Sequence, residues 1–390
     1  MKGATLALAV ALLSAAPARP LVAGAIDVGG PPSSLAAGAG GSIVYVGLDQ
    51  HFGRGGGIAA YRRSDGRLVR LGFTAVPNGT QGIALLPDGS AIVATTRVGI
   101  AAVATAPLIA GAHADATTVR DGDAPATSQI VAARDGRHVF YTSAATATLG
   151  VAEVTPHDGA APSLRVVAHV PLDRAPAGLA LSPDGATVYV VSEVAKNSDG
   201  LAGAADPRIG RERCASNFGA QGTLSAVSAA AAVADPANAV TARVAAGCGP
   251  TRVVLSKDGS VAWVSVRGEN RVLAFDARRL AGDAAKPLLA DVAVGPIPVG
   301  LALDASGARL LVANSHRSRD PDVAGAADLS LIDVAAALHL SGGVVATIPT
   351  GALAREILAL PDGSFAVTDY NADAVDVIPA HRLDRRTGPA

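Results

Sequence analysis

An apolar hairpin with a tight glycine turn recurs seven times along this 390-residue chain, and the repetition predicts an all-β fold, a seven-bladed β-propeller with four-stranded blades. The clearest copy spans residues 176–191, where an apolar strand leads through Pro183, Asp184 and Gly185 into a strand rich in Val. The turn glycines follow one another at intervals of 48, 47, 49, 74, 48 and 56 residues. They are Gly41, Gly89, Gly136, Gly185, Gly259, Gly307 and Gly363.

Two further short apolar segments follow most hairpins and supply the third and fourth strands of each predicted blade. After the fifth hairpin they are residues 271–275 and 291–294, and after the sixth they are residues 329–332 and 344–348. Four strands in a period of this length are typical of a propeller blade.

The two ends of the chain are expected to close the ring together. The last copy stops after its third strand, residues 374–378, and a lone strand-like segment, residues 21–28, precedes the first hairpin. An N-terminal strand that completes the seventh blade removes the open edge of that sheet. We therefore expect a single propeller domain over residues 19–390.

The fourth repeat carries an insertion at about residues 196–221, since its interval is 74 residues where most are close to 48. Two interpretations are open: a lid or partner-docking loop, or a loop without a role of its own that is tolerated at small entropic cost. Cys214 in the insertion and Cys248 are the two cysteines of the chain. In an oxidising compartment they favour a disulfide over metal binding or catalysis.

Residues 1–18 are predicted to be a cleaved signal peptide. Lys2 supplies positive charge, residues 5–13 are apolar, and Ala16 and Ala18 suit cleavage after Ala18. The apolar run is shorter than the ~20 residues of a membrane-spanning helix. We expect a periplasmic or secreted protein with no membrane span.

The near-equal numbers of positive and negative side chains limit the classes of partner that are expected. The 32 Lys and Arg nearly match the 33 Asp and Glu, so no overall basic field attracts nucleic acid. No nucleotide-binding, haem-attachment or zinc motif is found, and Asp320, Asp322 and Asp328 are interpreted as a solvated acidic loop rather than a Ca²⁺ site. We expect no cofactor, no metal and a monomer whose partner is a small molecule, a cell-wall component or a protein.

Several segments resemble the YVTN family of β-propeller repeats over essentially the whole mature chain. They read PVGLAL (298–303), LVAN (311–314), IPTG (348–351) and PDG (361–363). The fifth copy, with Thr251-Arg252 and Arg267-Gly268, also resembles the propeller lactonase family, in which a comparable hairpin ends in an Arg-Gly pair. The first resemblance implies the fold, and the second implies hydrolysis of sugar lactones.

Two equivalent positions in each repeat are predicted to face one rim of the axial tunnel. Seven residues before the turn glycines stand Ser34, Gly82, Gln129, Gly178, Arg252, Gly300 and Glu356. Eight residues after them stand Asp49, Arg97, Ala144, Glu193, Arg267, Ser315 and Asn371, with Asn314, His316, Arg355 and Asp369 as polar neighbours. The candidate ligand-binding residues are Gln129, Arg252, Arg267, Asn314, Arg355, Glu356, Asp369 and Asn371.

Three interpretations of this rim are open. Its polar residues are solvated loops that pair across blades, or they bind a ligand or partner without chemistry, or they catalyse. We favour a binding or scaffold module. In the alternative, a lactonase-like hydrolase or related isomerase, Glu193, Glu356 or His316 acts as acid or base, and Arg252 or Arg267 stabilises an oxyanion.

Overall fold

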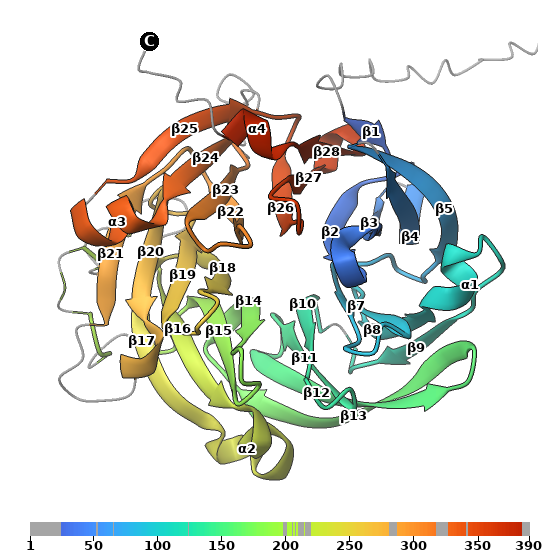
Figure 1. The fold of residues 1–390 in the computed structure, drawn as a ribbon. Helices are drawn as coiled ribbons and strands as arrows, with labels where there is room; N and C mark the ends of the chain where they lie inside the picture. Colours follow the sequence, from blue (N-terminus) through green and yellow to red (C-terminus); the bar gives the residue numbers. More distant parts are fainter. Residues whose placement is uncertain are drawn as a thin grey trace, which may run out of the picture.

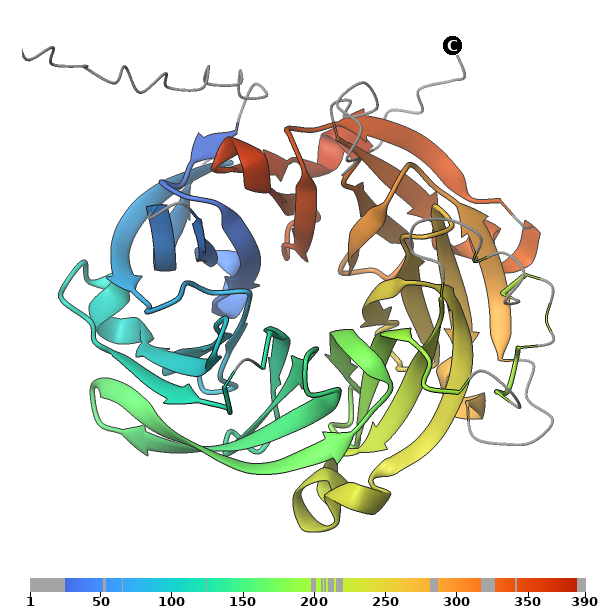
Figure 2. The same ribbon diagram turned by 180° about the vertical axis from the view of Figure 1, so that it is seen from behind.

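Seven antiparallel sheets of four strands are arranged in a ring, so the predicted seven-bladed β-propeller is confirmed (Figure 1). The view from behind shows the same closed ring (Figure 2). The computed structural model describes residues 25–51, 54–64, 66–123, 125–197, 201–204, 206, 208–209, 214, 220–280, 287–316, 327–340 and 342–383. The predicted signal peptide, residues 1–18, lies outside the described residues.

Each blade runs from an inner strand at the axis to an outer strand at the periphery. The first blade contains β2 (Pro32–Ala37), β3 (Ile43–His51), β4 (Arg54–Ser64) and β5 (Arg67–Ala75). The second contains β6 (Gly82–Leu85), β7 (Ala91–Thr95), β8 (Gly99–Ala104) and β9 (Ala116–Arg120). The third contains β10 (Thr127–Ala132), β11 (His138–Ser143), β12 (Thr148–His157) and β13 (Ala160–Pro171). The fourth blade contains β14 (Arg174–Leu181), β15 (Thr187–Val194), β16 (Gln221–Ser228) and β17 (Val240–Cys248). The fifth contains β18 (Pro250–Leu255), β19 (Val261–Val266), β20 (Arg271–Asp276) and β21 (Leu288–Ala293). The sixth contains β22 (Pro298–Leu303), β23 (Arg309–Asn314), β24 (Asp328–Asp333) and β25 (Val344–Pro349).

The seventh blade is built from both ends of the chain. It contains β26 (Ala354–Ala359), β27 (Phe365–Asp369), β28 (Ala374–Ile378) and the N-terminal β1 (Ile26–Asp27). β1 pairs antiparallel with β28, with Ile26 opposite Val375 and Asp27 opposite Ala374. The predicted closure is therefore confirmed, and β1 covers the edge of β28 that would otherwise be open.

The predicted turn glycines have the backbone conformation that their residue type favours. All seven have φ between +67° and +80°, a region that glycine adopts without steric cost. In the fourth blade the Gly185 amide donates to the Ser182 carbonyl at 2.8 Å, which closes the turn. This local preference explains why one short motif recurs in every blade.

The hydrophobic core is divided among the seven interfaces between neighbouring sheets. Seven clusters of buried side chains each draw on two adjacent blades, and most of their members are Ala, Val, Leu and Ile. Between the fifth and sixth blades, for example, the fully buried Trp263 packs in one cluster with Leu310. Small side chains let the sheets pack closely around the axis.

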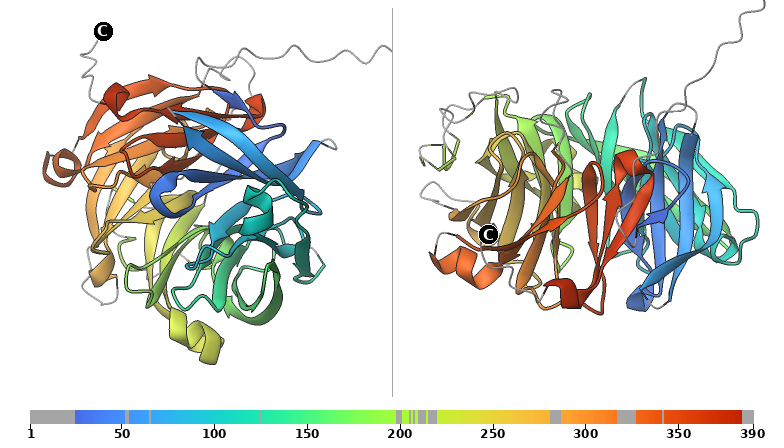
Figure 3. Two further views of the ribbon diagram at one scale, coloured as in Figure 1. Left: turned by 45° about the vertical axis from the view of Figure 1, so that its right-hand side comes forward. Right: turned by 90° about the horizontal axis from the view of Figure 1, so that it is seen from above.

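The ring has two different rims. We call the rim at which inner strands begin and second strands end the insertion rim, because it carries the long connection between β15 and β16. The opposite, turn rim carries the glycine turns together with α1 (Thr105–Ile109), α2 (Ala229–Ala234), α3 (Val334–Leu340) and α4 (Ala380–Leu383). Figure 3, right, shows α3 and α4 on one side of the ring and the described part of the β15–β16 connection on the other.

The described part of the insertion packs on the outside of the fourth blade. Ala202 forms a parallel bridge with Val244 of the outer strand β17, and Ile209 is fully buried in the cluster between the fourth and fifth blades. Cys214 forms a disulfide with Cys248 at the end of β17, with 5.2 Å between the Cα atoms, which confirms the predicted pairing. These contacts hold this part of the insertion at the periphery rather than over the axis.

Candidate functional site

The inner strands of three blades each present a large polar side chain toward the axis at a local irregularity in strand pairing. In the third, fifth and seventh blades the register between the first two strands shifts next to Gln129, Arg252 and Glu356. The amide of each of these residues then donates to a hydroxyl on the second strand, at 3.1, 3.1 and 2.9 Å. The acceptors are Thr142, Ser265 and Thr368. A bulge of this kind redirects a side chain, here toward the ring centre.

Two of these hydroxyls also connect neighbouring blades. Thr142 Oγ1 donates to the Ala177 carbonyl of the fourth blade at 2.8 Å, and Ser265 Oγ donates to the Val299 carbonyl of the sixth blade at 2.7 Å. Each hydroxyl therefore satisfies a buried amide and a buried carbonyl at once. The axis-facing side chains are positioned by this buried network rather than by mobile loops.

Gln129, Arg252 and Glu356, which we call the axial group, meet across the axis. Arg252 Nε donates to Glu356 Oε2 at 3.3 Å, and Gln129 Nε2 donates to the same oxygen at 3.4 Å. β10, β18 and β26, which carry them, lie on different sides of the ring centre (Figure 1). The Arg252 and Glu356 side chains are only 8% and 15% exposed.

Glycines alternate with the axial group around the ring and make the convergence possible. Gly82, Gly178 and Gly300 occupy the equivalent positions of the second, fourth and sixth blades. A Cβ on Gly178 would lie 2.6 Å from the Thr251 carbonyl oxygen and 2.7 Å from Arg252 Cα. The absence of a side chain thus lets the next inner strand approach closely, and that strand carries the next large polar residue.

Glu193 and Arg267 form a second ion pair beside the axial group. Glu193, in β15, accepts from Arg267 Nη2, which follows β19 in the next blade. Burial raises the pKa of Glu193, and the positive charges of Arg267 and Arg252 offset part of that shift. Arg252 is therefore close enough to act on Glu193 as well as on Glu356, so the two pairs belong to one electrostatic site.

A third set, Asp49, Arg97, Arg355 and Tyr370, which we call the rim group, spans the first, second and seventh blades. Asp49 accepts from Arg97 Nη2 at 3.1 and 3.0 Å, and from the Tyr370 hydroxyl at 2.6 Å. Burial and the hydrogen bond to Asp49 raise the pKa of Tyr370 to about 12. The Arg355 guanidinium lies over the Tyr370 ring, 5.1 Å from its centroid. Tyr370 was not among the predicted site residues.

Four of the predicted ligand-binding or catalytic residues lie apart from these sets. Asn314 is fully buried and donates to Asp328 at 2.5 Å and to Ser330 at 2.9 Å, and His316 contacts Asp328 at 3.0 Å, all within the sixth blade. Asp369 is 1% exposed and accepts from Thr350 at 2.9 Å. Asn371 is exposed in the short helix η5 (Tyr370–Ala372).

Two buried aspartates that the sequence analysis did not single out connect successive blades. Asp121 accepts from the Tyr141 hydroxyl at 2.7 Å and contacts His169 Nε2 at 2.8 Å. Asp173 accepts from Thr223 Oγ1 at 2.8 Å and from Arg243 Nη2 at 2.8 Å. Each follows an outer strand within two residues, so an Asp that recurs at the end of the second and third repeats is the sequence pattern that could have identified them.

The described residues contain one cluster of metal-ligating side chains, Cys214, Cys248 and Glu269. Its two sulfur atoms are joined in the disulfide, so they are not available as thiolate ligands. Glu269 Oε1 instead accepts from the Cys248 amide at 2.9 Å. The cluster therefore stabilises the end of β17 and is not a metal site.

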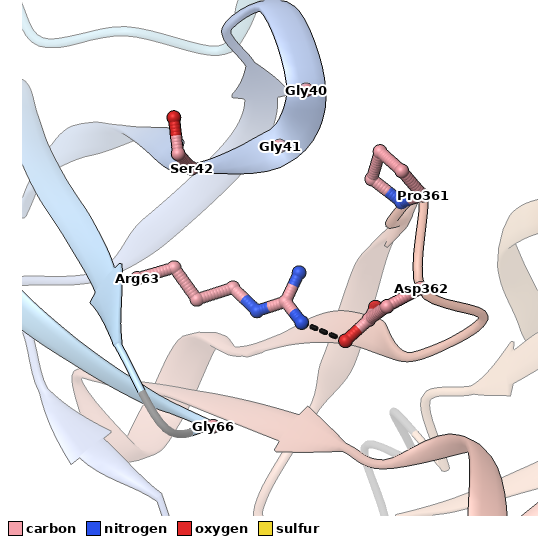
Figure 4. A pocket seen from close by; sticks show the side chains of 7 residues that line it. All are labelled: Gly40, Gly41, Ser42, Arg63, Gly66, Pro361 and Asp362. Atoms are coloured by element: carbon pink, nitrogen blue, oxygen red, sulfur yellow. Dashed lines mark hydrogen bonds and ion pairs between the residues drawn. The ribbon is translucent and has the colours of Figure 1, made fainter.

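Two surface cavities lie away from the insertion rim, at the seam between the first and seventh blades. One of about 410 Å³ is lined by the turns that contain Gly41 and Pro361, and an ion pair joins Arg63 to Asp362 across it (Figure 4). A larger one of about 740 Å³ continues along β5 toward α4. Both are at the turn rim and contain none of the predicted site residues.

Comparison with known proteins identifies the architecture. No protein-family model and no curated protein matches the chain. Similar solved structures include hydrazine synthase from Kuenenia stuttgartiensis, at 15% identity and a TM-score of 0.63, covering 90% of this chain and 96% of that one. The β-propeller domain of Cps50 (Swd1) from Myceliophteria thermophila has 10% identity and a TM-score of 0.61, with 91% and 99% covered.

A third similar structure is a functionally unknown protein from Desulfotomaculum acetoxidans, at 13% identity and a TM-score of 0.59, with 87% and 90% covered. At such identities the likeness shows the fold alone. The chain is thus a seven-bladed β-propeller, an architecture consistent with a binding or scaffold module. Among the described residues no helix is long and apolar enough to cross a membrane, and the disulfide fits an extracellular protein.

Proposed function

We propose that this protein is an exported propeller of the YVTN-repeat type that binds a ligand or partner through its insertion rim. The observation that carries the proposal is the convergence of Gln129, Arg252 and Glu356 from three alternate blades on one point of the axis. A small number of convergent polar side chains fixed by a rigid scaffold is what gives a binding site its orientation and specificity. The paired Glu193 and Arg267 extend this polar surface outward.

The proposal includes export, with residues 1–18 as a cleaved signal peptide. The disulfide between Cys214 and Cys248 supports an oxidising compartment, since cytosolic thiols are kept reduced. Amino-terminal sequencing of the protein recovered from periplasm or culture medium tests this point. A mature chain that begins at Arg19 agrees with the proposal, and a full-length chain retained in the cytosol contradicts it.

Binding through the rim is tested by a thermal-shift screen of the mature protein against lactones, divalent metals and cell-wall fragments. An Arg252→Ala/Arg267→Ala double variant removes both paired guanidinia of the site. An Arg165→Ala/Arg278→Ala variant removes two guanidinia that are 70% and 67% exposed elsewhere. A ligand that stabilises the wild type and the control, but not the site variant, supports the proposal. Equal stabilisation of all three contradicts it.

A lactonase-like hydrolase is the second candidate, and the raised pKa of Glu193 favours it. A partly buried carboxyl flanked by two guanidinia, Arg267 and Arg252, is a suitable arrangement for a general acid near an oxyanion-stabilising group. The observation against a hydrolase is that the carboxylates of Glu193 and Glu356 are both engaged in ion pairs. Lactone turnover that is lost in Glu193→Gln but retained in Glu153→Gln, a change at a side chain that is 40% exposed, would establish the enzyme.

A further inference from the structure

The charged side chains of the axial group, the rim group and the Glu193–Arg267 pair are unequal in number. They are four guanidinium groups, those of Arg97, Arg252, Arg267 and Arg355, and three carboxylates, those of Asp49, Glu193 and Glu356. Three ion pairs form: Arg97 with Asp49, Arg252 with Glu356, and Arg267 with Glu193. Because a guanidinium stays protonated in proteins, these seven groups carry one positive charge in excess.

Arg355 carries the excess charge. Within the described part of the chain its guanidinium has no carboxylate within ion-pair distance, while each of the other three has one. Burial and the like charge of Arg252 lower the pKa of Arg355, and Tyr370, Glu356 and Asp49 offset this only in part. Arg252 and Glu356 belong to the axial group, so Arg355 is the member of the rim group that interacts electrostatically with the axial group.

The Arg355 guanidinium is also held in place. It lies over the Tyr370 ring with 5.1 Å to the centroid, and the Tyr370 hydroxyl is anchored by its 2.6 Å hydrogen bond to the buried Asp49. Stacking on an aromatic face uses the flat side of a guanidinium and leaves the in-plane N–H groups available. Such a fork fits the two oxygen atoms of a carboxylate or phosphate.

We propose that the ligand of the insertion rim is a small oxyanion, a molecule carrying a carboxylate or a phosphate group that binds to the guanidinium of Arg355. The inference rests on the proposed function and specifies its ligand chemistry. The bound anion neutralises the excess charge and relieves the repulsion between Arg355 and Arg252. The neutral parts of the ligand then extend over the axial group, where Gln129 and the Arg252–Glu356 pair provide polar contacts.

Isothermal titration of the mature protein with inorganic phosphate and with acetate, each compared with sodium chloride at equal ionic strength, tests the inference. We expect saturable binding of at least one oxyanion, a loss of at least tenfold in affinity in Arg355→Gln, and a smaller loss in Arg355→Lys, which keeps the charge but not the fork. Phosphate and acetate in separate titrations distinguish the two ligand classes. The matched control, Arg165→Gln, changes a 70% exposed guanidinium and keeps wild-type affinity.

A second measurement uses the unmodified protein, so its result does not depend on whether a variant folds. Crystals of the unmodified protein soaked in selenate should show an anomalous peak beside the Arg355 guanidinium. Oxyanion affinity that is unchanged in folded Arg355→Gln, or a peak elsewhere and none at Arg355, overturns the inference. A neutral ligand that depends on Arg252 and Arg267 but not on Arg355 also overturns it while leaving the rim-binding function intact. A rim that binds no ligand at all ends both proposals.

Discussion

Arg252 of the fifth blade donates from Nε to Glu356 Oε2 of the seventh blade at 3.3 Å, so a single ion pair reaches past the sixth blade near the axis. Its two side chains are 8% and 15% exposed. Neither charge can be removed alone without leaving the other charge unpaired in a poorly solvated position, so single substitutions are expected to destabilise the folded state.

Arg252→Met and Glu356→Gln should each lower the free energy of unfolding by about 2–4 kcal/mol, because each leaves an uncompensated, largely buried polar partner. The double variant should lose less than the sum of the two single changes, since the residues are in direct contact. Urea unfolding of the wild type and the three variants measures the coupling. Additive losses would show that the pair contributes nothing as a pair.

Gly178→Ala should destabilise the protein and disturb the axial group. The new Cβ would lie 2.6 and 2.7 Å from backbone atoms of Thr251 and Arg252, which have little room to move. Overpacking of this kind costs about 1–3 kcal/mol. Gly342→Ala is the matched control, since a Cβ there meets nothing within 4 Å. Thermal unfolding should separate the two variants, and equal melting temperatures contradict the close approach.

Reduction of the disulfide should destabilise the folded state. Cys214 and Cys248 are 34 residues apart in the sequence, and closing a loop of that length stabilises a protein by about 4 kcal/mol on the chain-entropy estimate. We expect a lower urea midpoint with reductant, and the same midpoint in Cys214→Ser/Cys248→Ser with or without reductant. A wild-type midpoint that is insensitive to reductant contradicts the expectation.

The carboxyl group of Asp369 should make the free energy of unfolding decrease as the pH rises. Burial raises the pKa of Asp369 from 3.8 to about 7, the neighbouring Asp376 adds to this, and the hydrogen bond from Thr350 opposes it. In the unfolded chain the pKa is about 3.9, so the folded state binds the proton more tightly. The stabilisation is complete below about pH 4 and is lost as the pH rises toward 7.

The measurement is the free energy of unfolding of Asp369→Asn relative to the wild type between pH 4 and pH 8. At ~1.4 kcal/mol per pKa unit, the variant should gain up to about 4 kcal/mol over the wild type across this interval. Asp158→Asn, at an exposed hairpin end, is the control and should show no such gain. A pH-independent difference between wild type and Asp369→Asn contradicts a raised pKa.

The candidate site was predictable in its position but not in its contacts. Counting from the turn glycines selected Gln129, Arg252 and Glu356, and the structure brings these three together. Asn314 and Asp369 were grouped with them as polar neighbours of the counted positions, although both side chains are buried inside their own blades. A strand pattern gives the place of a residue along the strand, while bulges and neighbouring hydroxyls decide where its side chain points. The roles of all these residues in binding stay predictions.

The amino-acid pattern alone was sufficient to predict the blade, the number of blades, the closure by an N-terminal strand and the pairing of the two cysteines. The hairpin depends on local turn chemistry and on the alternation of apolar residues, which each repeat expresses without its neighbours, and the other features follow from counting the repeats, the end strands and the cysteines. The ion pairs between blades across the axis, and the position of Arg355 over Tyr370 beside Asp49, became known from the folded ring. Those contacts join residues that are up to 321 positions apart, so they exist only once the ring has closed.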